Sequence, residues 1–190
     1  MGTRLISLLL ILLAWAAPAP AEVEIAFYSK DFAKSFPHGF VRLTGTVDST
    51  GEQIDTNYGF TPYHLSFAIL SGPVPGHIAT VSPLYVSRSD RHFALKLSEE
   101  QYRTVMGIVE KWRAMPQPSY YLNSRNCVFF VAEVAAALGL EATLPRKLIK
   151  KPRSFLTKVK QDNLALIAAW PARPALTTKQ APGPARIPAQ

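Results

Sequence analysis

Apolar and polar residues alternate along the first half of the chain. An apolar residue at every second position is typical of a strand with one buried face. This pattern predicts strands over residues 23–28, 38–47, 53–60, 77–86 and 91–97. Because the turn-forming residues Asp-Ser-Thr-Gly at 48–51 separate the second segment from the third, residues 38–60 are expected to form a hairpin.

Two later segments repeat apolar residues at helical spacing. The first follows the capping-box pattern Ser-Glu-Glu-Gln at residues 98–101 and ends before Pro116. Its apolar side is formed by Tyr102, Val105, Val109 and Trp112. The second is expected to begin after Asn126, whose side chain can cap the first turn, and to end at Gly139. This order of strands and helices predicts one α+β domain over residues 22–144.

The N-terminal residues 1–21 are predicted to be a signal peptide. Arg4 supplies the positive end, residues 5–17 are apolar, and Ala-Pro-Ala at 19–21 is a small-residue cleavage signal. An uncleaved N-terminal anchor, or poor cleavage caused by the nearby prolines, are the alternatives. The mature chain is therefore expected in a periplasm or outside the cell.

The positive charge of the chain lies mainly in its C-terminal part. Residues 22–144 carry ten Lys and Arg against twelve Asp and Glu, whereas residues 145–190 carry ten against one. Residues 145–170 are predicted to be a basic extension, with an amphipathic helix over 155–170 that docks on the domain or lies on an anionic surface. The Pro- and Ala-rich residues 171–190 are expected to be disordered.

The chain holds a single cysteine, Cys127, which falls in the first turn of the second predicted helix. The helix dipole and the free N–H groups there favour a thiolate, so a lowered thiol pKa and fast alkylation are expected. A lone cysteine is, however, also commonly a small buried apolar residue. Reactivity is favoured because an exported single cysteine has no partner within its chain for a disulfide.

A nucleophilic thiol needs a base, and histidine suits this role near neutral pH. The four candidates are His38, His64, His77 and His92. His38 and His77 each begin a predicted strand, whereas the other two lie inside apolar stretches and are more readily interpreted as packed or surface residues.

Two short motifs resemble the circularly permuted papain-like thiol enzymes. These are Pro-His-Gly-Phe-Val-Arg-Leu at residues 37–43 and Asn-Cys-Val-Phe-Phe-Val at residues 126–131. The superfamily includes NlpC-type cell-wall amidases and the lecithin:retinol acyltransferase-like group, and in its permuted members the histidine strand precedes the cysteine helix. Phe129 stands where the acyltransferase-like group often carries His. The Asp-Thr-Asn-Tyr-Gly-Phe run at 55–60 is similar to one in uncharacterised exported bacterial proteins.

The resemblance implies a papain-like fold with an antiparallel sheet packed against helices. It also implies that Cys127 is the nucleophile, that His38 is the general base, and that N–H groups at the helix start hold the oxyanion. A third polar group would orient the imidazole: Asn57 is preferred and Asp55 is the alternative, since both face the same side of one predicted strand. The expected binding residues are Tyr58, Tyr121 and Asn126.

The sequence thus predicts an exported cysteine hydrolase or acyltransferase that acts on an amide or ester bond, with cell-wall peptide or a lipid-like molecule as its partner. The alternatives are a catalytically inactive envelope-binding module of the same fold and a structural envelope protein anchored by its basic tail. Neither a metal nor a cofactor is expected, because the chain has no zinc-type ligand spacing and no phosphate-binding glycine loop. Nucleic-acid binding is not expected of the acidic folded part, and a monomer is expected.

Overall fold

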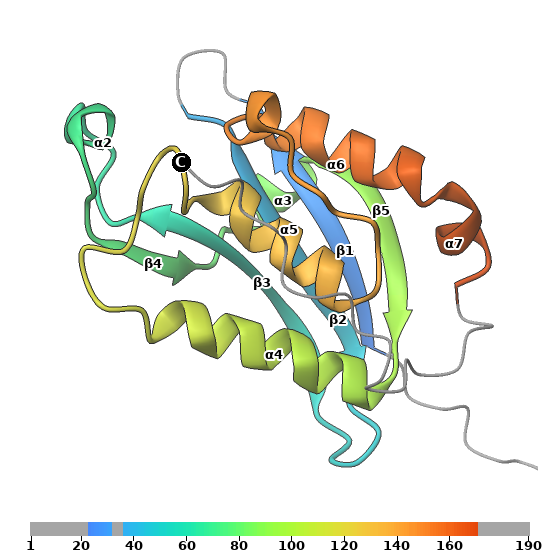
Figure 1. Cartoon of the computed structure of the whole chain (residues 1–190). Helices are drawn as coiled ribbons and strands as arrows, with labels where there is room; N and C mark the ends of the chain where they lie inside the picture. Colours follow the sequence, from blue (N-terminus) through green and yellow to red (C-terminus); the bar gives the residue numbers. More distant parts are fainter. Residues whose placement is uncertain (1–22, 32–35, 171–190) are drawn as a thin grey trace, which may run out of the picture.

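The computed structural model describes residues 23–31 and 36–170 (Figure 1). The predicted signal peptide and residues 171–190 lie outside them. The described chain is an α+β fold whose five antiparallel strands lie in the order β4-β3-β2-β1-β5. The strands are β1 (Val23–Lys30), β2 (His38–Thr46), β3 (Gln53–Pro62), β4 (Gly76–Ala79) and β5 (Asp90–Leu97).

The strand predictions hold at four of the five segments, and the hairpin of β2 and β3 is confirmed by pairing from Val41–Tyr58 to Thr46–Gln53. The single long strand predicted over 77–86 is wrong. Only Gly76–Ala79 pairs with β3, and Pro83–Ser87 forms the short helix α3. Pro83 has no N–H for a strand ladder, and the Ser82 hydroxyl accepts a bond from the Tyr85 N–H, which starts a helix instead.

Both predicted long helices are present with the predicted ends. They are α4 (Glu99–Arg113) and α5 (Cys127–Ala137). The other helical segments besides α3 are α2 (Ala68–Ser71), η1 (Arg146–Leu148), α6 (Pro152–Asp162) and α7 (Leu164–Ala168). Ser98 and Gln101 form both bonds of the capping box that begins α4. Gly139 follows α5 with a φ of 82°, a left-handed conformation that glycine adopts without steric cost.

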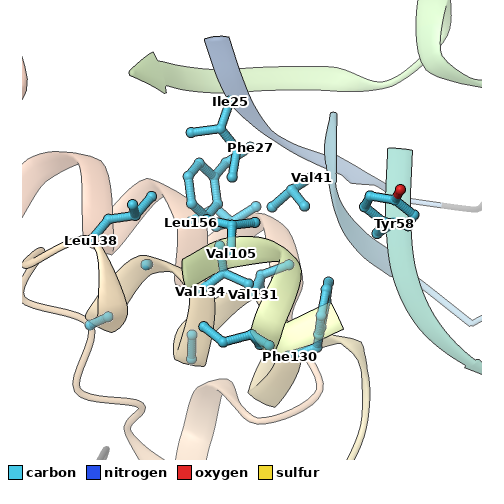
Figure 2. Close-up of a cluster of buried hydrophobic side chains, with 14 of the residues drawn as sticks. Ile25, Phe27, Val41, Tyr58, Val105, Phe130, Val131, Val134, Leu138 and Leu156 are labelled. Atoms are coloured by element: carbon cyan, nitrogen blue, oxygen red, sulfur yellow. The ribbon is translucent and has the colours of Figure 1, made fainter. Parts of the chain in front are cut away.

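Helices α4, α5 and α6 cover one face of the sheet, and α3 lies against the other face (Figure 1). Helix α5 packs on β2 and β3, and α6 packs on β1 and β5. The main core forms between the helices and the sheet, where Phe27, Val41, Val131 and Leu156 meet (Figure 2). None of the described helices is long and apolar enough to cross a membrane.

The basic segment after residue 144 belongs to this core. Phe155, Leu156 and Val159 of α6 are at most 1% exposed and pack in the same apolar cluster as the sheet. The Trp170 indole donates a hydrogen bond to the Lys96 carbonyl of β5. Of the two alternatives for this segment, the structure shows docking on the domain. The single helix predicted over 155–170 is wrong, because the segment forms two helices, α6 and α7, that meet at Asn163, whose side chain donates to the carbonyls of Glu141 and Val159.

Two leucines at the C-terminal end allow a matched test of this packing. Leu156→Ala should lower the free energy of unfolding by about 2–5 kcal/mol, because it opens a cavity in the core. Leu164→Ala should change it by less than about 0.5 kcal/mol, because the Leu164 side chain is 56% exposed. Urea denaturation measures both, and equal losses would contradict the placement of α6.

Candidate functional site around Cys127

Asn126 fixes the start of α5 and, with it, the position of Cys127. The Asn126 side chain is buried, and its Oδ1 accepts a 2.7 Å hydrogen bond from the Val128 N–H. Its Nδ2 donates to the carbonyls of Leu122, at 2.7 Å, and Ile149, at 2.8 Å. One amide therefore joins the start of α5 and the chain just before it to Ile149, which lies 23 residues further along the sequence. Although Asn126 lines the pocket described below, these bonds give it a structural role.

The Cys127 thiol lies at the end of the sheet where β2 begins. Its Sγ is 3.9 Å from the carbonyl oxygen of Pro37, and the N–H groups of Gly39, Cys127 and Val128 lie close enough to lower the pKa of the thiol. The pairing of β2 with β3 ends at Val41–Tyr58, before Gly39 is reached, whereas on its other side β2 pairs with β1 through Gly39 and His38. The thiol thus contacts the backbone on both sides of His38.

Burial decides the ionisation of this thiol. Only 5% of Cys127 is exposed, and desolvation raises the pKa of the thiol to about 11. The three neighbouring N–H groups lower the pKa, but they do not offset the loss of water. The expectation of a lowered thiol pKa is therefore wrong for the unliganded protein, because the burial that accompanies this helix start outweighs the effect of its N–H groups.

Cys127 borders a pocket of about 250 Å³. Its walls come from the β1–β2 connection, α2, the segment before α5 and the segment before α6. The lining residues are Phe36, Pro37, Leu70, Tyr120, Leu122, Asn126, Cys127, Val128, Lys150 and Pro152. The walls are mainly apolar, and Lys150 carries the only charge among these residues. A pocket of this kind suits an apolar group attached to a polar or anionic one.

His38 lies next to the thiol in the backbone, but its imidazole lies on the other side of the strand. The ring stacks on Phe40, with 5.9 Å between centroids, and Phe40 packs with Tyr85 on the α3 face. Gly39, by contrast, faces Val131 of α5. Within the described residues no hydrogen bond joins His38 to Cys127. Burial lowers the pKa of His38 to about 4, so in the unliganded protein both the imidazole and the thiol are neutral, on opposite sides of the strand.

Gly59 creates the space that the His38 ring fills. A Cβ atom at Gly59 would lie 2.4 Å from His38 Nε2 and 3.0 Å from the Phe40 Cβ. Gly59 pairs with Ala79 at one end of the β3–β4 ladder, one residue beyond the last β2–β3 pair, Val41–Tyr58. Its role is the close approach of a neighbouring side chain.

The structure does not bring Asn57 or Asp55 to the imidazole. The Asn57 carboxamide accepts the Val81 N–H at 2.7 Å and donates to the Val81 carbonyl at 2.9 Å, so it holds the chain between β4 and α3. Asp55 pairs with Arg42 at 2.9 Å. Both side chains share a face of β3, as expected, but they lie further along the hairpin than His38 and have other partners.

Neither tyrosine expected to bind substrate lines the pocket. Tyr58 is buried in the main core, and the Arg113 guanidinium lies over its ring. The Arg125 guanidinium lies over the ring of Tyr121. Tyr120 lines the pocket instead, because its backbone bonds with Val74 in both directions and so turns its side chain inward. Adjacent tyrosines outside a regular strand give no periodic signal to tell which of them faces inward.

The other described histidines lie outside the pocket lining. His92 is hydrogen-bonded to the buried Ser29 hydroxyl at 2.8 Å, His77 stacks on Tyr63, and His64 is exposed. Over residues 23–31 and 36–170, no three His, Cys, Asp or Glu side chains gather closely enough to hold a metal ion.

A substitution at Gly59 tests the position of the His38 imidazole. Gly59→Ala should displace the His38 ring, lower stability by about 1–3 kcal/mol and bring the His38 pKa back toward its ordinary value. Gly107→Ala is the control, because its added Cβ would meet no neighbouring atom within 4 Å. Alanine at this position in α4 should raise the free energy of unfolding by about 0.5–1 kcal/mol. NMR titration and urea denaturation measure these effects, and an unchanged His38 pKa in Gly59→Ala would contradict the assigned contact.

The low pKa of His38 predicts a dependence of stability on pH. Between its folded pKa of about 4 and its ordinary value of 6.5, the unfolded chain binds a proton at His38 that the folded chain does not bind. Stability should therefore fall as the pH is lowered through this window, by up to about 3 kcal/mol from this residue.

His38→Gln removes the titrating group and should flatten that part of the pH dependence. His64→Gln, at an exposed position, should leave it unchanged. Urea denaturation of the three proteins at neutral pH and at about pH 4.5 gives the comparison. Parallel losses in wild type and His38→Gln would show that His38 is not the group responsible.

Comparison with known proteins adds no family to this description. The chain matches no protein-family model, no curated protein and no solved structure. The resemblance to the permuted papain-like enzymes therefore depends on the two short motifs and on the position of Cys127, and it stays a prediction.

Proposed function

We propose that the protein is an exported, papain-like cysteine hydrolase or acyltransferase that acts on an amide or ester bond of cell-envelope peptide. The observation that carries the proposal is the position of the Cys127 thiol, which lies at the first residue of α5, borders a pocket and has several backbone N–H groups around it. This is the environment in which a developing oxyanion is stabilised.

The N–H groups are the clearest catalytic feature. Cys127 is the first residue of α5, so its N–H has no acceptor within the helix, and the Gly39 N–H lies close enough to the thiol to lower its pKa. A substrate carbonyl placed over Sγ would direct its oxygen at donors of this kind. The pocket beside the thiol would take the apolar side chain of the acyl group, with Lys150 available for a carboxylate.

The ionisation of the site favours general-base catalysis over a preformed thiolate. Sulfur attacks the carbonyl carbon while the neutral His38 imidazole takes the thiol proton. The imidazolium then gives this proton to the departing amine or alcohol, and a thioester remains on Cys127. Water, or a second alcohol or amine, attacks the thioester and regenerates the thiol, which distinguishes hydrolysis from acyl transfer.

This mechanism requires the imidazole to move. In the unliganded protein the ring lies over Gly59, but the Pro37 carbonyl and the Gly39 N–H on either side of His38 already meet the thiol. To reach Sγ, the ring has to leave its stacking position on Phe40 and pass around the end of β2. Substrate in the pocket would stabilise the rotated imidazole, because the charge that the imidazole gains is paired with the oxyanion.

A catalytically inactive binding module is the second candidate. The absence of a His38–Cys127 hydrogen bond and the high thiol pKa favour this alternative. In such a module the pocket would bind the same apolar and anionic groups, and Cys127 would be a buried apolar residue of its wall.

The rates at which two reagents modify Cys127, each compared with the rate at a reference thiol, distinguish the hydrolase from the binding module. The reference is Cys127→Ser with Ser154→Cys, which moves the thiol to an exposed position on α6. Iodoacetamide, which has no oxyanion to stabilise, should react more slowly with wild type than with the reference, because burial disfavours the Cys127 thiolate. A p-nitrophenyl ester should acylate wild type at least about tenfold faster than the reference, because its attack forms an oxyanion.

His38→Ala should slow that acylation about a hundredfold, which is typical of the loss of a general base. Mass spectrometry of the acylated peptide places the group on Cys127, and circular dichroism checks that the variant is folded. If wild type reacts more slowly than the reference with both reagents, the hydrolase is excluded and the binding module takes its place.

A further inference from the structure

We propose that the rim of the Cys127 pocket docks on an anionic lipid bilayer through the apolar α2 turn, with the basic segment at residues 146–151 beside it. The proposal concerns a surface and does not depend on catalysis at Cys127. It is carried by exposed apolar side chains, by the distribution of charge around them, and by their shared position at the pocket.

The α2 turn presents apolar side chains to solvent on a fixed backbone. Leu65 and Leu70 are each 62% exposed, and Phe67 is 88% exposed. The turn is held in place because Ile69 is buried, Tyr63 stacks on His77 and the Tyr63 N–H donates to the Pro75 carbonyl. Figure 1 shows α2 projecting beyond the ends of β3 and β4. An ordered apolar projection of this kind marks an interaction site.

Three of the four segments that form the pocket carry basic residues and no carboxylate, and Asp31, in the β1–β2 connection, pairs with Arg153. No Asp or Glu occurs in residues 56–89, 111–132 or 142–161, which are the segments that form α2, the chain leading into α5 and the chain leading into α6. The cations in the last of these include Arg146, Lys147, Lys150 and Lys151, which are exposed and form no ion pair with a carboxylate in the part of the chain described. Such a surface complements a negative one.

The apolar and the basic groups belong to the same rim. Leu70 of α2 and Lys150 both line the pocket that Cys127 borders. Figure 1 shows α2 and η1 at the same end of the molecule, with the start of α5 between them. A bilayer against this rim would receive Leu65 and Phe67 among its acyl chains and would meet the lysines at its headgroups.

The combination favours a bilayer over a soluble peptide. A peptide in the pocket would contact Leu70 and Lys150, but it would leave Phe67, on the projecting turn, in water. A lipid surface is broad enough to cover the turn and the basic segment together. Apolar insertion with nearby lysines is the pattern of proteins that bind at the membrane interface.

Sedimentation with sucrose-loaded vesicles tests the proposal on the chain without its predicted signal peptide, in the Cys127→Ser background so that turnover plays no part. Vesicles of phosphatidylethanolamine and phosphatidylglycerol should bind the protein, and binding should weaken at high salt and on phosphatidylcholine alone. Leu65→Ser with Phe67→Ser should weaken binding at least about tenfold. Lys150→Glu with Lys151→Glu should weaken it on the anionic vesicles only.

Leu84→Ser with Leu164→Ser is the matched control, because these side chains are 58% and 56% exposed on α3 and α7. It should bind within about twofold of the parent. Equal binding by all variants would overturn the proposal and assign binding to residues outside the rim. Binding to purified cell-wall sacculi but not to vesicles, lost in Leu65→Ser with Phe67→Ser, would replace the bilayer with a peptide polymer as the partner.

Discussion

One buried side chain, that of Asn126, holds the site together. A buried amide that lacks its hydrogen bonds is costly, so the three bonds of Asn126 fix the relative positions of the α5 start, the Leu122 carbonyl and the Ile149 carbonyl. Leu122 and Lys150, which adjoin these contacts, are both walls of the pocket. The thiol, the pocket and the capped helix start are therefore one cooperative unit, in which the cap residue contributes more than the usual single bond of an N-cap.

The same burial that builds the site keeps it uncharged. Desolvation raises the thiol pKa and lowers the imidazole pKa, so each group is neutral at physiological pH. Gly59 contributes to this state, since it lets the ring lie against the strand where a side chain would displace it. A neutral pair costs less free energy to bury than an ion pair that lacks further hydrogen bonds. An occupied pocket would change this balance, because new charge on substrate could be paired with charge on the imidazole.

The sequence was sufficient wherever a signal was local. The capping box at Ser98, the Asn126 cap and the Gly139 stop each depend on residues within one turn, and each is present. Contacts between distant segments could not be predicted in this way. The alternation over 77–86 predicted a strand, although Pro83 within it begins a helix. Asp55 and Asn57 were correctly predicted to share one side of their strand, but their hydrogen-bond partners were not predicted. Nothing in the neighbouring sequence marks Phe36 or Lys150 as a pocket residue, because only the fold brings these side chains to Cys127.

The segment after residue 144 shows how a basic composition can conceal a structural role. Its lysines suggested an extension to the domain, yet Phe155 and Leu156 are buried in the common core. Pro152 lies against Gly39, so close that a Cβ there would approach it to 3.1 Å, and the Ile149 carbonyl accepts one bond of Asn126. The chain up to residue 144 would thus have a thiol but an incomplete pocket, since Lys150 and Pro152 would be missing from its walls. The apolar side of α6 packs in the core and so fixes this wall in place, while Arg153 and Lys158 on its charged side pair with Asp31, Asp90 and Asp162.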